Sequence, residues 1–310
     1  MNKKLDKKLF FVYNPYSGRE KLRDKLYGIL DEFSLAGYEV TAHPTMYARD
    51  AYESVAALPD GYDLVVAAGG DGTLDEVVSA MIQREHKIPI GYIPAGSTND
   101  YAKSLRIPSD MRAAAAAAVQ GRPFTVDTGL FNGRSFTYCA AFGLFTEVSY
   151  ATSRTLKNLF GHMAYVLEGA KSLLDVKSYK MKVETAQMSF KGDFIYGMVS
   201  NSKSVGGFKS IVGKNVLFDD GLFEVTFIRR PRNPGELGEI LTALMNGRLD
   251  TEYIYSFKSA HVTVRSKKTV PWAHDGEPGG EWTRTVISVS PRAVDINIPC
   301  GEWENLTAGK

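Results

Sequence analysis

Cysteine is scarce in this chain. Only Cys139 and Cys300 occur among its 310 residues, and they lack the CxxC spacing of a zinc or redox site. Their number excludes a disulfide framework of the kind that holds small secreted domains together. A reducing, cytoplasmic compartment fits this composition.

Long apolar runs are missing as well. No uninterrupted apolar stretch approaches the ~18 residues needed to cross a bilayer, and the N-terminus lacks the apolar core of a signal peptide. We therefore expect a cytoplasmic protein that meets the inner face of the membrane only transiently.

Net charge of either sign is small. The 37 basic and 35 acidic residues give a formal charge of +2, too little to indicate a nucleic-acid partner. Basic residues nevertheless gather within residues 3–8 and 229–232. A solvated face is the simple interpretation of both clusters, and weak attraction to an anionic membrane is the alternative.

Two common phosphate-binding motifs are absent. The pattern GxxxxGK[ST] does not occur, which excludes a P-loop NTPase. The dinucleotide pattern GxGxxG fails because Gly70 and Gly72 are followed by Asp75 at the place of the third glycine. A Rossmann dehydrogenase is therefore disfavoured.

The first part of the chain alternates short apolar runs with amphipathic stretches. Strands are expected at residues 9–13, 38–42, 64–68 and 88–93, with helices between them and further helices starting near Asn99 and Ser109. This rhythm is typical of βαβ units with a parallel sheet.

From about residue 124 the segments are mostly β-like. The expected fold class is therefore α/β plus β. An N-terminal doubly wound α/β nucleotide-binding domain, residues 1–126, precedes a mostly antiparallel, β-sandwich-like domain, residues 127–310, whose last residues are free to pack back on the first domain.

A glycine-rich loop follows the strand at residues 64–68. Its sequence from Gly69 is GGDGTLDE, and glycines at the carboxyl end of a parallel strand let a phosphate chain approach the backbone and the next helix. Asp71 is either a turn-forming residue or a carboxylate that holds Mg²⁺, and we favour the second. Thr73 and Glu76 have the spacing of a capping box.

A second loop, PAGSTND at residues 94–100, also lies between a strand and a helix. Ser97 or Thr98 is expected to start that helix, with Asn99 and Asp100 in its first turn. Farther along, Asp275-Gly276-Glu277 alone predicts only a hairpin turn.

Five motifs together carry a resemblance to a known family. They are Asn14-Pro15-Tyr16-Ser17-Gly18, residues 69–76, residues 94–100, Asp219-Asp220-Gly221 and Asp275-Gly276-Glu277. Their order and spacing resemble the soluble bacterial diacylglycerol kinase and YegS-like lipid kinase family, although GGDGT alone is shared with NAD kinases and related phosphofructokinases. The resemblance implies ATP-dependent transfer of the γ-phosphoryl group to a lipid hydroxyl. The first candidate acceptor is diacylglycerol, which would become phosphatidic acid.

The resemblance also implies roles for particular residues. Glu277 would be the general base, and Asp71 would organise Mg²⁺ and the phosphates of the co-substrate ATP. Asn99, Asp100, Asp127 and Asp275 would form a supporting network. The residues implied at ATP are Asn14, Thr45, Gly69, Gly70, Asp71, Gly72, Thr73, Leu74, Asp75, Glu76, Gly96, Ser97 and Thr98.

A second, structural magnesium site is implied at residues 217–222. Its ligands would be the Asp220 side chain and the main-chain carbonyls of Leu217 and Leu222. Oxygen ligands suit this hard ion, and a simple β-turn is the alternative.

The sequence departs from the family pattern at three positions. Asp75 stands where asparagine is common, Ser97 where threonine is usual, and Arg19 where lysine follows the NPxSG stretch. No carboxylate is lost. Asp75 adds a negative charge near the phosphates, which would weaken nucleotide affinity unless a cation compensates.

A lipid substrate requires peripheral docking on a membrane. The segment TLKNLFGHM, residues 155–163, mixes apolar and basic side chains and is a candidate for that contact, with a core helix as the alternative. The sequence is compatible with a homodimer.

Two other functions stay open at this stage. A kinase for a soluble acceptor, chiefly NAD, shares GGDGT and a two-domain plan, and a non-catalytic lipid or nucleotide sensor could keep the fold. The motifs concern phosphate, so diacylglycerol, a sphingoid base, phosphatidylglycerol and an undecaprenol-like alcohol are all candidate acceptors.

Overall fold

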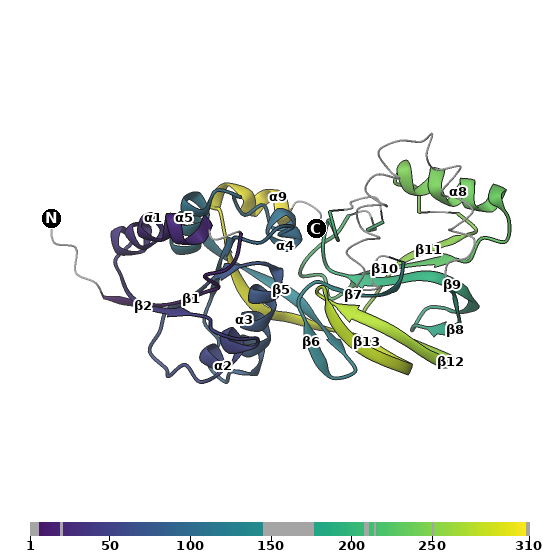
Figure 1. Ribbon diagram of the computed structural model, residues 1–310, viewed down its shortest axis with the longest axis horizontal. Helices are drawn as coiled ribbons and strands as arrows, with labels where there is room; N and C mark the ends of the chain where they lie inside the picture. The colour runs from purple at the N-terminus through teal and green to yellow at the C-terminus, as the bar shows by residue number, and fades with distance from the viewer. Residues whose placement is uncertain are drawn as a thin grey trace.

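The computed structural model describes residues 6–18, 21–144, 177–207, 211–213, 215–249 and 251–307. Figure 1 shows an α/β half that contains the N-terminal elements and a β-rich half that follows it. The expected fold class, α/β plus β, is confirmed. Two earlier expectations lie outside the described residues. They are the candidate membrane contact at residues 155–163 and the departure from the family pattern at Arg19.

The first half is a parallel sheet with helices on both faces. Its strands run in the order β4-β3-β1-β2, and Figure 1 shows α1 and α5 on one face with α2 and α3 on the other. The elements are β1 (Lys7–Tyr13), α1 (Lys21–Leu35), β2 (Tyr38–Pro44), α2 (Asp50–Ala56), β3 (Leu64–Gly69), α3 (Asp71–Gln83), β4 (Ile90–Pro94), α4 (Asp100–Ser104) and α5 (Met111–Gln120).

The strand order predicts where this sheet binds a ligand, namely at the carboxyl ends of its strands. β3 and β4 are buried at every position, as apolar runs in a sheet covered on both faces require. Because β1 has β2 on one side and β3 on the other, the chain reverses its winding direction there. Ligands of such sheets bind beyond the carboxyl ends of the strands at this switch point, here next to Tyr13 and Gly69.

The expected capping box of α3 is wrong. α3 begins at Asp71, Gly70 is its N-cap, and no side chain caps it. The carboxylate of Glu76 instead accepts hydrogen bonds from the backbone N–H groups of Arg49 (2.9 Å) and Ala51 (3.2 Å). Glu76 therefore stabilises the start of α2, whose unpaired N–H groups attract an acceptor.

Two other helices start close to the expected residues but have other N-cap residues. Neither Ser97 nor Thr98 starts α4, because Asn99 is its N-cap, in a left-handed conformation with φ 50°. α5 is capped by Asp110, whose carboxylate accepts from the backbone N–H of Ala113 at 2.9 Å. Both helices begin within two residues of the expected starts, Asn99 and Ser109.

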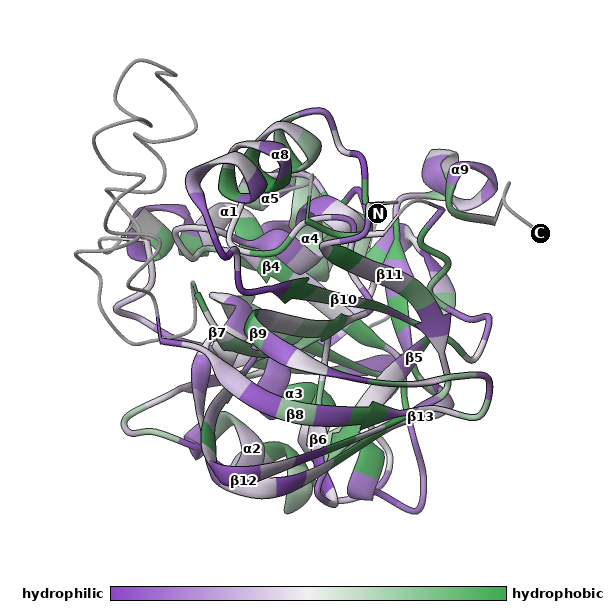
Figure 2. Ribbon diagram, turned by 90° about the vertical axis from the view of Figure 1, so that its right-hand side faces the viewer, coloured by the Kyte–Doolittle hydropathy of each residue, from purple (hydrophilic) through white to green (hydrophobic). Residues whose placement is uncertain are grey.

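The second half is mostly antiparallel, with β11, β10, β9, β7, β12 and β13 as successive neighbours. Exposed and buried residues alternate along β8, and Figure 2 shows this alternation as bands of colour. The elements are β5 (Arg122–Phe131), β6 (Arg134–Phe136), β7 (Cys139–Gly143), β8 (Tyr179–Glu184), β9 (Ser189–Ser200), β10 (Phe223–Arg229), α8 (Pro234–Met245), β11 (Ile254–Ser259), β12 (His261–His274), β13 (Glu277–Ile298), a 3-10 turn (Cys300–Glu302) and α9 (Trp303–Thr307).

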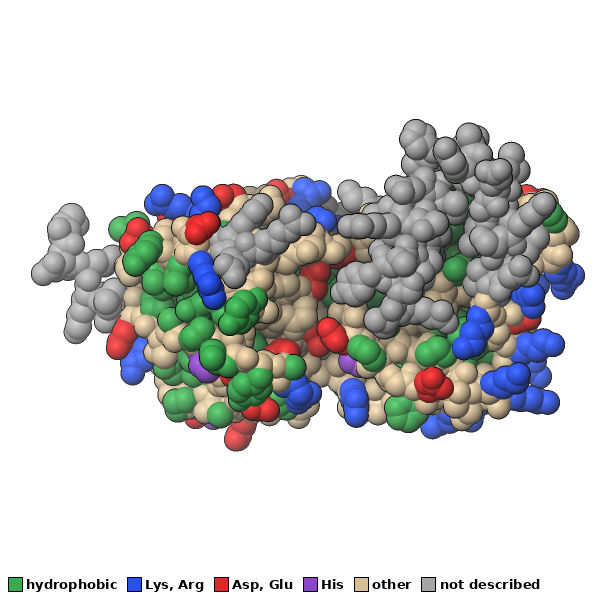
Figure 3. All heavy atoms as spheres, in the orientation of Figure 1, with side chains coloured by type: hydrophobic (Ala, Val, Ile, Leu, Met, Phe, Trp, Pro, Cys, Tyr) green, Lys and Arg blue, Asp and Glu red, His purple; other side chains and the backbone are tan. Residues whose placement is uncertain are grey.

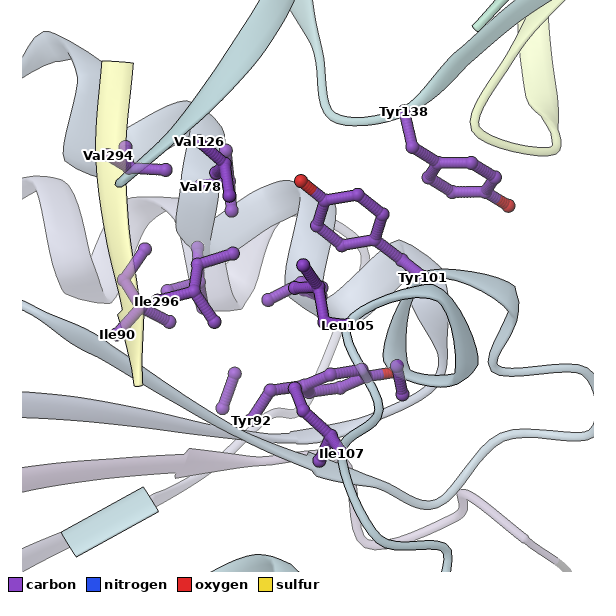
Figure 4. Packing of buried hydrophobic residues seen from close by; sticks show 14 of the residues in the cluster. Val78, Ile90, Tyr92, Tyr101, Leu105, Ile107, Val126, Tyr138, Val294 and Ile296 are labelled. Atoms are coloured by element: carbon purple, nitrogen blue, oxygen red, sulfur yellow. The ribbon is translucent and has the colours of Figure 1, made fainter. Parts of the chain in front are cut away.

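Two long strands join the halves. β13 pairs with β12 near its start, then with β5, and near its end it pairs in parallel with β4 through Ile296 and Ile90. Figure 4 shows Val294 and Ile296 packed beside Val126 in the core of the first half. β5 crosses residue 126 without interruption, so one sheet continues through the molecule.

Candidate active site

The two glycine loops meet at the carboxyl ends of β3 and β4. The N–H of Ala95 donates to the carbonyl of Gly69 at 2.7 Å. A Cβ on Gly96 would lie 2.6 Å from the Cα of Gly70, closer than real atoms approach, so this contact requires glycine. Asn99 closes the second loop, because its side chain exchanges two hydrogen bonds with the backbone of Gly96, each 2.9 Å long.

The first loop keeps part of its backbone open to a ligand. A Cβ on Gly69 would lie 2.3 Å from Oγ1 of Thr73, so the Thr73 side chain lies directly against Gly69. A Cβ on Gly72 would meet nothing within 4 Å. Leu74 differs from its neighbours, because its side chain is fully buried and its N–H donates to Gly70.

A pocket of about 200 Å³ adjoins this loop. Four residues that sequence reasoning placed at ATP line it, namely Asn14, Thr45, Thr73 and Glu76. The other lining residues are Tyr16, Met46, Tyr47, Ala48 and Ala51. The large side chains of Tyr16, Met46 and Tyr47 are exposed, and such apolar surfaces suit a planar base whose phosphates reach the glycine loop.

Asp71 lies at the start of α3 with one carboxylate oxygen unengaged. Oδ2 accepts from the N–H of Asp100 at 3.2 Å, whereas Oδ1 is buried and has no hydrogen-bond partner among the described residues. Burial raises the pKa of Asp71 above its usual range. A buried carboxylate oxygen without a donor is suited to a hard cation or to water bound to one.

The described part of the chain contains no group of three or more acidic, His or Cys side chains that could hold a metal ion. Mg²⁺ in phosphoryl-transfer sites usually binds one or two protein carboxylates together with phosphate oxygens and water. The donor set at Asp71 fits that kind of site.

Asp100 ties the second loop to the β-rich half. It is almost fully buried, and its carboxylate accepts from the hydroxyl of Ser204 at 2.8 Å and from the N–H of Gly207 at 3.2 Å. Because its own N–H binds Asp71, Asp100 links the start of α3 to the segment after β9. This arrangement supports the position of Asp71.

The carboxylate of Asp127 binds backbone N–H groups of two other segments. It is fully buried, and its two oxygens accept from the N–H groups of Arg292 and Gly221, each at 2.7 Å. Its own N–H donates to the carbonyl of Phe218 at 2.6 Å. Its expected link to magnesium stays a prediction.

The Asp275-Gly276 pair forms a two-residue hairpin between β12 and β13. Both residues have positive φ, 49° and 88°, and His274 pairs with Glu277 across the turn, as in a type I′ turn. The buried carboxylate of Asp275 accepts hydrogen bonds from three consecutive backbone N–H groups, those of Thr137, Tyr138 and Cys139. The hairpin is thereby fixed against the segment before β7.

Asp75 turns toward this hairpin. Its Oδ1 accepts from the hydroxyl of Thr137 at 2.8 Å, and its carboxyl group hydrogen-bonds that of Asp275. Burial first, and then the negative charge of Asp75, raise the pKa of Asp275 well above its usual range. Asp275 therefore keeps its proton to a higher pH than an exposed carboxyl group does.

Glu277 lies on the same side of the molecule as Asp75. Burial lowers the pKa of His274, and the charges of both Asp75 and Glu277 act on this ring in the opposite direction, so the two acids are near it. Glu277 itself is exposed. Figure 3 shows acidic side chains gathered where the two halves meet. The hairpin that bears Glu277 is joined to α3 through Thr137, which binds both Asp275 and Asp75.

The implied structural magnesium site does not fit a divalent ion. Oδ1 of Asp220 accepts from the N–H of Leu222 at 3.0 Å, and Oδ2 binds the ammonium group of Lys258 at 2.9 Å. The turn itself is present, with Gly221 at φ 74°. The carboxylate expected to hold the metal is already paired with a cation from the chain.

Sequence reasoning missed several residues of the site. Thr137 binds both Asp75 and Asp275, and the rings of Tyr101 and Tyr138 stack at 5.7 Å. No local pattern indicates Thr137, because Asp75 is 62 residues away in the chain. The motif residues Ser97 and Thr98, by contrast, lie at the surface of the second loop, exposed and half-buried respectively.

The sequence matches two family models. Residues 8–131 match the diacylglycerol kinase catalytic domain, and residues 140–298 match the YegS C-terminal NAD kinase beta sandwich-like domain. A diacylglycerol kinase of Staphylococcus carnosus is 34% identical over 94% of this chain and 95% of its own length. A diacylglycerol kinase of Staphylococcus aureus is 32% identical, with coverage of 94% and 93%.

Solved structures show the same fold. A diacylglycerol kinase from Bacillus anthracis str. Sterne superposes with a TM-score of 0.72 at 19% identity, covering 94% of this chain and 97% of the other. A second structure from the same strain gives a TM-score of 0.78 at 21% identity with the same coverage. The chain belongs to the YegS-like diacylglycerol kinase family of ATP-dependent lipid kinases.

Proposed function

We propose that this lipid kinase transfers the γ-phosphoryl group of ATP to the hydroxyl of diacylglycerol, yielding phosphatidic acid, with Mg²⁺ as cofactor. The proposal rests on one observation, the connection between the glycine loop and the hairpin. The glycine loop with the unengaged Oδ1 of Asp71 continues into α3, and Asp75 of α3 is tied through Thr137 to Asp275 of the hairpin that bears Glu277. The acceptor follows the names of the staphylococcal relatives.

The nucleotide is assigned to the pocket beside the first loop. Its base would lie against the exposed side chains of Tyr16, Met46 and Tyr47. Its phosphates would extend over Gly72, where no side chain intervenes, toward the N–H groups at the start of α3, which attract anions. The hydroxyls of Ser97 and Thr98 are available at the rim of the second loop.

Asp71 is the residue proposed to hold the metal ion. Its buried Oδ1 supplies an oxygen ligand without a competing donor. When bound, Mg²⁺ would offset the negative charge of the triphosphate. Asp100 keeps this carboxylate in place through its N–H.

Glu277 is proposed to act as the general base. Its carboxylate would accept the proton of the lipid hydroxyl as the new O–P bond forms and the bond from the γ-phosphorus to the bridging oxygen breaks, leaving ADP. Because Glu277 is exposed, the bound lipid itself must exclude water there. The buried Asp275 positions the hairpin for this step.

Membrane contact is proposed to be peripheral. Among the described residues, no helix has the length and the apolar character required to cross a bilayer. Arg229, Arg230 and Arg232 line a pocket of about 300 Å³ together with Lys191, and acidic residues share its wall. A homodimer and a cytoplasmic location at the inner membrane face stay predictions.

The test follows labelled γ-phosphate from ATP into a total lipid extract, into dioleoylglycerol in mixed micelles, and into NAD. Label is expected in phosphatidic acid, and EDTA is expected to abolish it. Glu277→Gln should lower kcat by about 100-fold or more, the usual range for a general base. Glu281→Gln, an exposed acid on the same strand, is the matched control and should keep wild-type rates.

Three outcomes would contradict the proposal. Label in NAD and not in lipid would favour a soluble acceptor. Tight ATP binding without turnover on any lipid would indicate a sensor. Wild-type kcat in Glu277→Gln would remove the role of this residue while leaving the lipid kinase activity intact.

A further inference from the structure

The ammonium group of Lys258 lies beside the turn at residues 215–222, which we call the acidic loop. Its ammonium nitrogen is 2.9 Å from Oδ2 of Asp220 and 2.9 Å from the carbonyl oxygen of Asn215. It is also 3.2 Å from Oε1 of Glu224, an ion pair without hydrogen-bond geometry. Three oxygens from three places in the chain therefore surround one cation.

The sheet fixes this cation in place. Glu224 on β10 and Lys258 on β11 are directly opposite each other in the antiparallel pair, so their side chains start close together on the same face. The side chain of Glu224 is only 2% exposed and that of Asp220 18%. Because both carboxylates are largely removed from water, each needs a compensating charge.

We infer that the Lys258 ammonium is the built-in structural cation of the acidic loop, in the place where a divalent metal ion would otherwise hold Asp220. The inference is independent of the proposed function. Both oxygens of Asp220 are already engaged, one by the N–H of Leu222 and one by Lys258. A divalent ion on this carboxylate would lie within a few ångströms of the ammonium, where like charges repel strongly at low dielectric.

The acidic loop is joined to β5 through Asp127. The N–H of Gly221 donates to Asp127 at 2.7 Å, and the carbonyl of Phe218 accepts from the N–H of Asp127 at 2.6 Å. A tethered ammonium keeps this connection at any metal concentration.

The test compares thermal unfolding of the full chain in EDTA, in Mg²⁺ and in Ca²⁺, without nucleotide. Wild-type Tm should be the same in all three. Lys258→Met keeps the aliphatic chain and removes the charge, so its Tm in EDTA should fall by roughly 3 to 8 °C and should recover in Ca²⁺ or Mg²⁺, because the vacated oxygens suit a hard cation. Lys267→Met, at an exposed position of β12, is the matched control and should show neither effect.

Each contrary result overturns the inference. A wild-type Tm that rises with divalent ions, and loses this rise in Asp220→Asn, would show that the loop binds metal despite Lys258. A Lys258→Met protein that is destabilised but not rescued by either ion would reduce Lys258 to an ordinary ion pair. If Lys258→Met fails to fold in EDTA, the yield of folded protein in Ca²⁺ is compared with the yield in EDTA, and an equal yield would overturn the inference. In the wild type, loss of phosphoryl transfer in EDTA without a change in Tm would separate this cation from the catalytic metal.

Discussion

Asp75 is the residue whose structural role differs most from its expected effect. It was expected to place a negative charge near the phosphates, yet its side chain binds Thr137 and Asp275 on the side of the β-rich half. Asparagine at this position could accept from Thr137 through its carbonyl and donate to Asp275 through its amide. Asp75→Asn therefore replaces a negative charge beside Asp275 by a neutral hydrogen-bond donor.

This substitution predicts a change in the pH dependence of stability. Burial, with the charge of Asp75, raises the pKa of Asp275 well above its usual 3.8, so the folded chain holds a proton that the unfolded chain releases. The free energy of unfolding then falls as the pH rises from about 4 toward the pKa of folded Asp275. Asp75→Asn should lower that pKa and flatten the fall, by about 1.4 kcal/mol for each unit removed.

Urea unfolding at pH 5, 6, 7 and 8 measures this effect. The advantage of Asp75→Asn over wild type should grow with pH, whereas Asp24→Asn, an exposed acid on α1, should run parallel to wild type. Parallel curves for wild type and Asp75→Asn would mean that Asp75 does not raise the pKa of Asp275.

Residue types in local motifs were predictable, and their distant partners were not. Asp71 and Glu277 stand out because glycines or turn residues adjoin them in the sequence. Lys258 and Thr137 do not, because each acquires its role from residues 38 and 62 positions away. Such contacts arise only when the strands pair, so no sequence window contains them.

At the scale of elements, the glycines of the two loops differ in how closely other atoms pack against them. Gly72 and Gly96 are both glycines of the phosphate loops, but only Gly96 is pressed against backbone. Gly72→Ala should leave the free energy of unfolding unchanged or raise it by up to about 1 kcal/mol, since alanine is the better helix former. Gly96→Ala should lower it by about 1–3 kcal/mol because the loops must move apart.

Gly72→Ala and Gly96→Ala should differ in their effect on stability but not in their effect on nucleotide binding. Both substitutions are expected to raise the KM for ATP, Gly72→Ala by blocking the approach of the phosphates and Gly96→Ala by shifting Gly70. Denaturant unfolding and steady-state kinetics on the same preparations would show it. An unchanged KM in a stable Gly72→Ala protein would mean that the phosphates do not pass over Gly72.

Strand positions followed from apolar runs, and helix starts did not follow from capping patterns. β1, β3 and β4 match their expected segments closely, because a buried strand needs consecutive apolar residues. The Thr73–Glu76 spacing failed because Glu76 finds the N–H groups of Arg49 and Ala51, 27 and 25 residues earlier. Tertiary contacts competed with the local cap and displaced it.

At the scale of the whole molecule, β5 and β13 belong to both hydrophobic cores. Val126 and Ile296 lie in the core of the first half, whereas Phe131 and Ile287, on the same two strands, lie in the core of the second. The α/β and β-rich composition of the two parts was evident from the sequence. The sharing of two strands was not, because it depends on pairing between residues about 170 positions apart, as between Thr125 and Asp295.

Shared strands predict that the halves unfold together. Ile296→Ala removes a fully buried side chain at the junction of β13 with β4 and β5, and should lower the free energy of unfolding by about 2–5 kcal/mol. Calorimetry should show one transition that moves as a whole, with Leu35→Ala, at a 67% exposed position of α1, changing stability by less than about 0.5 kcal/mol. Two separate transitions, of which Ile296→Ala moves only one, would mean that the common sheet does not couple the nucleotide end of the site to the half that carries Glu277.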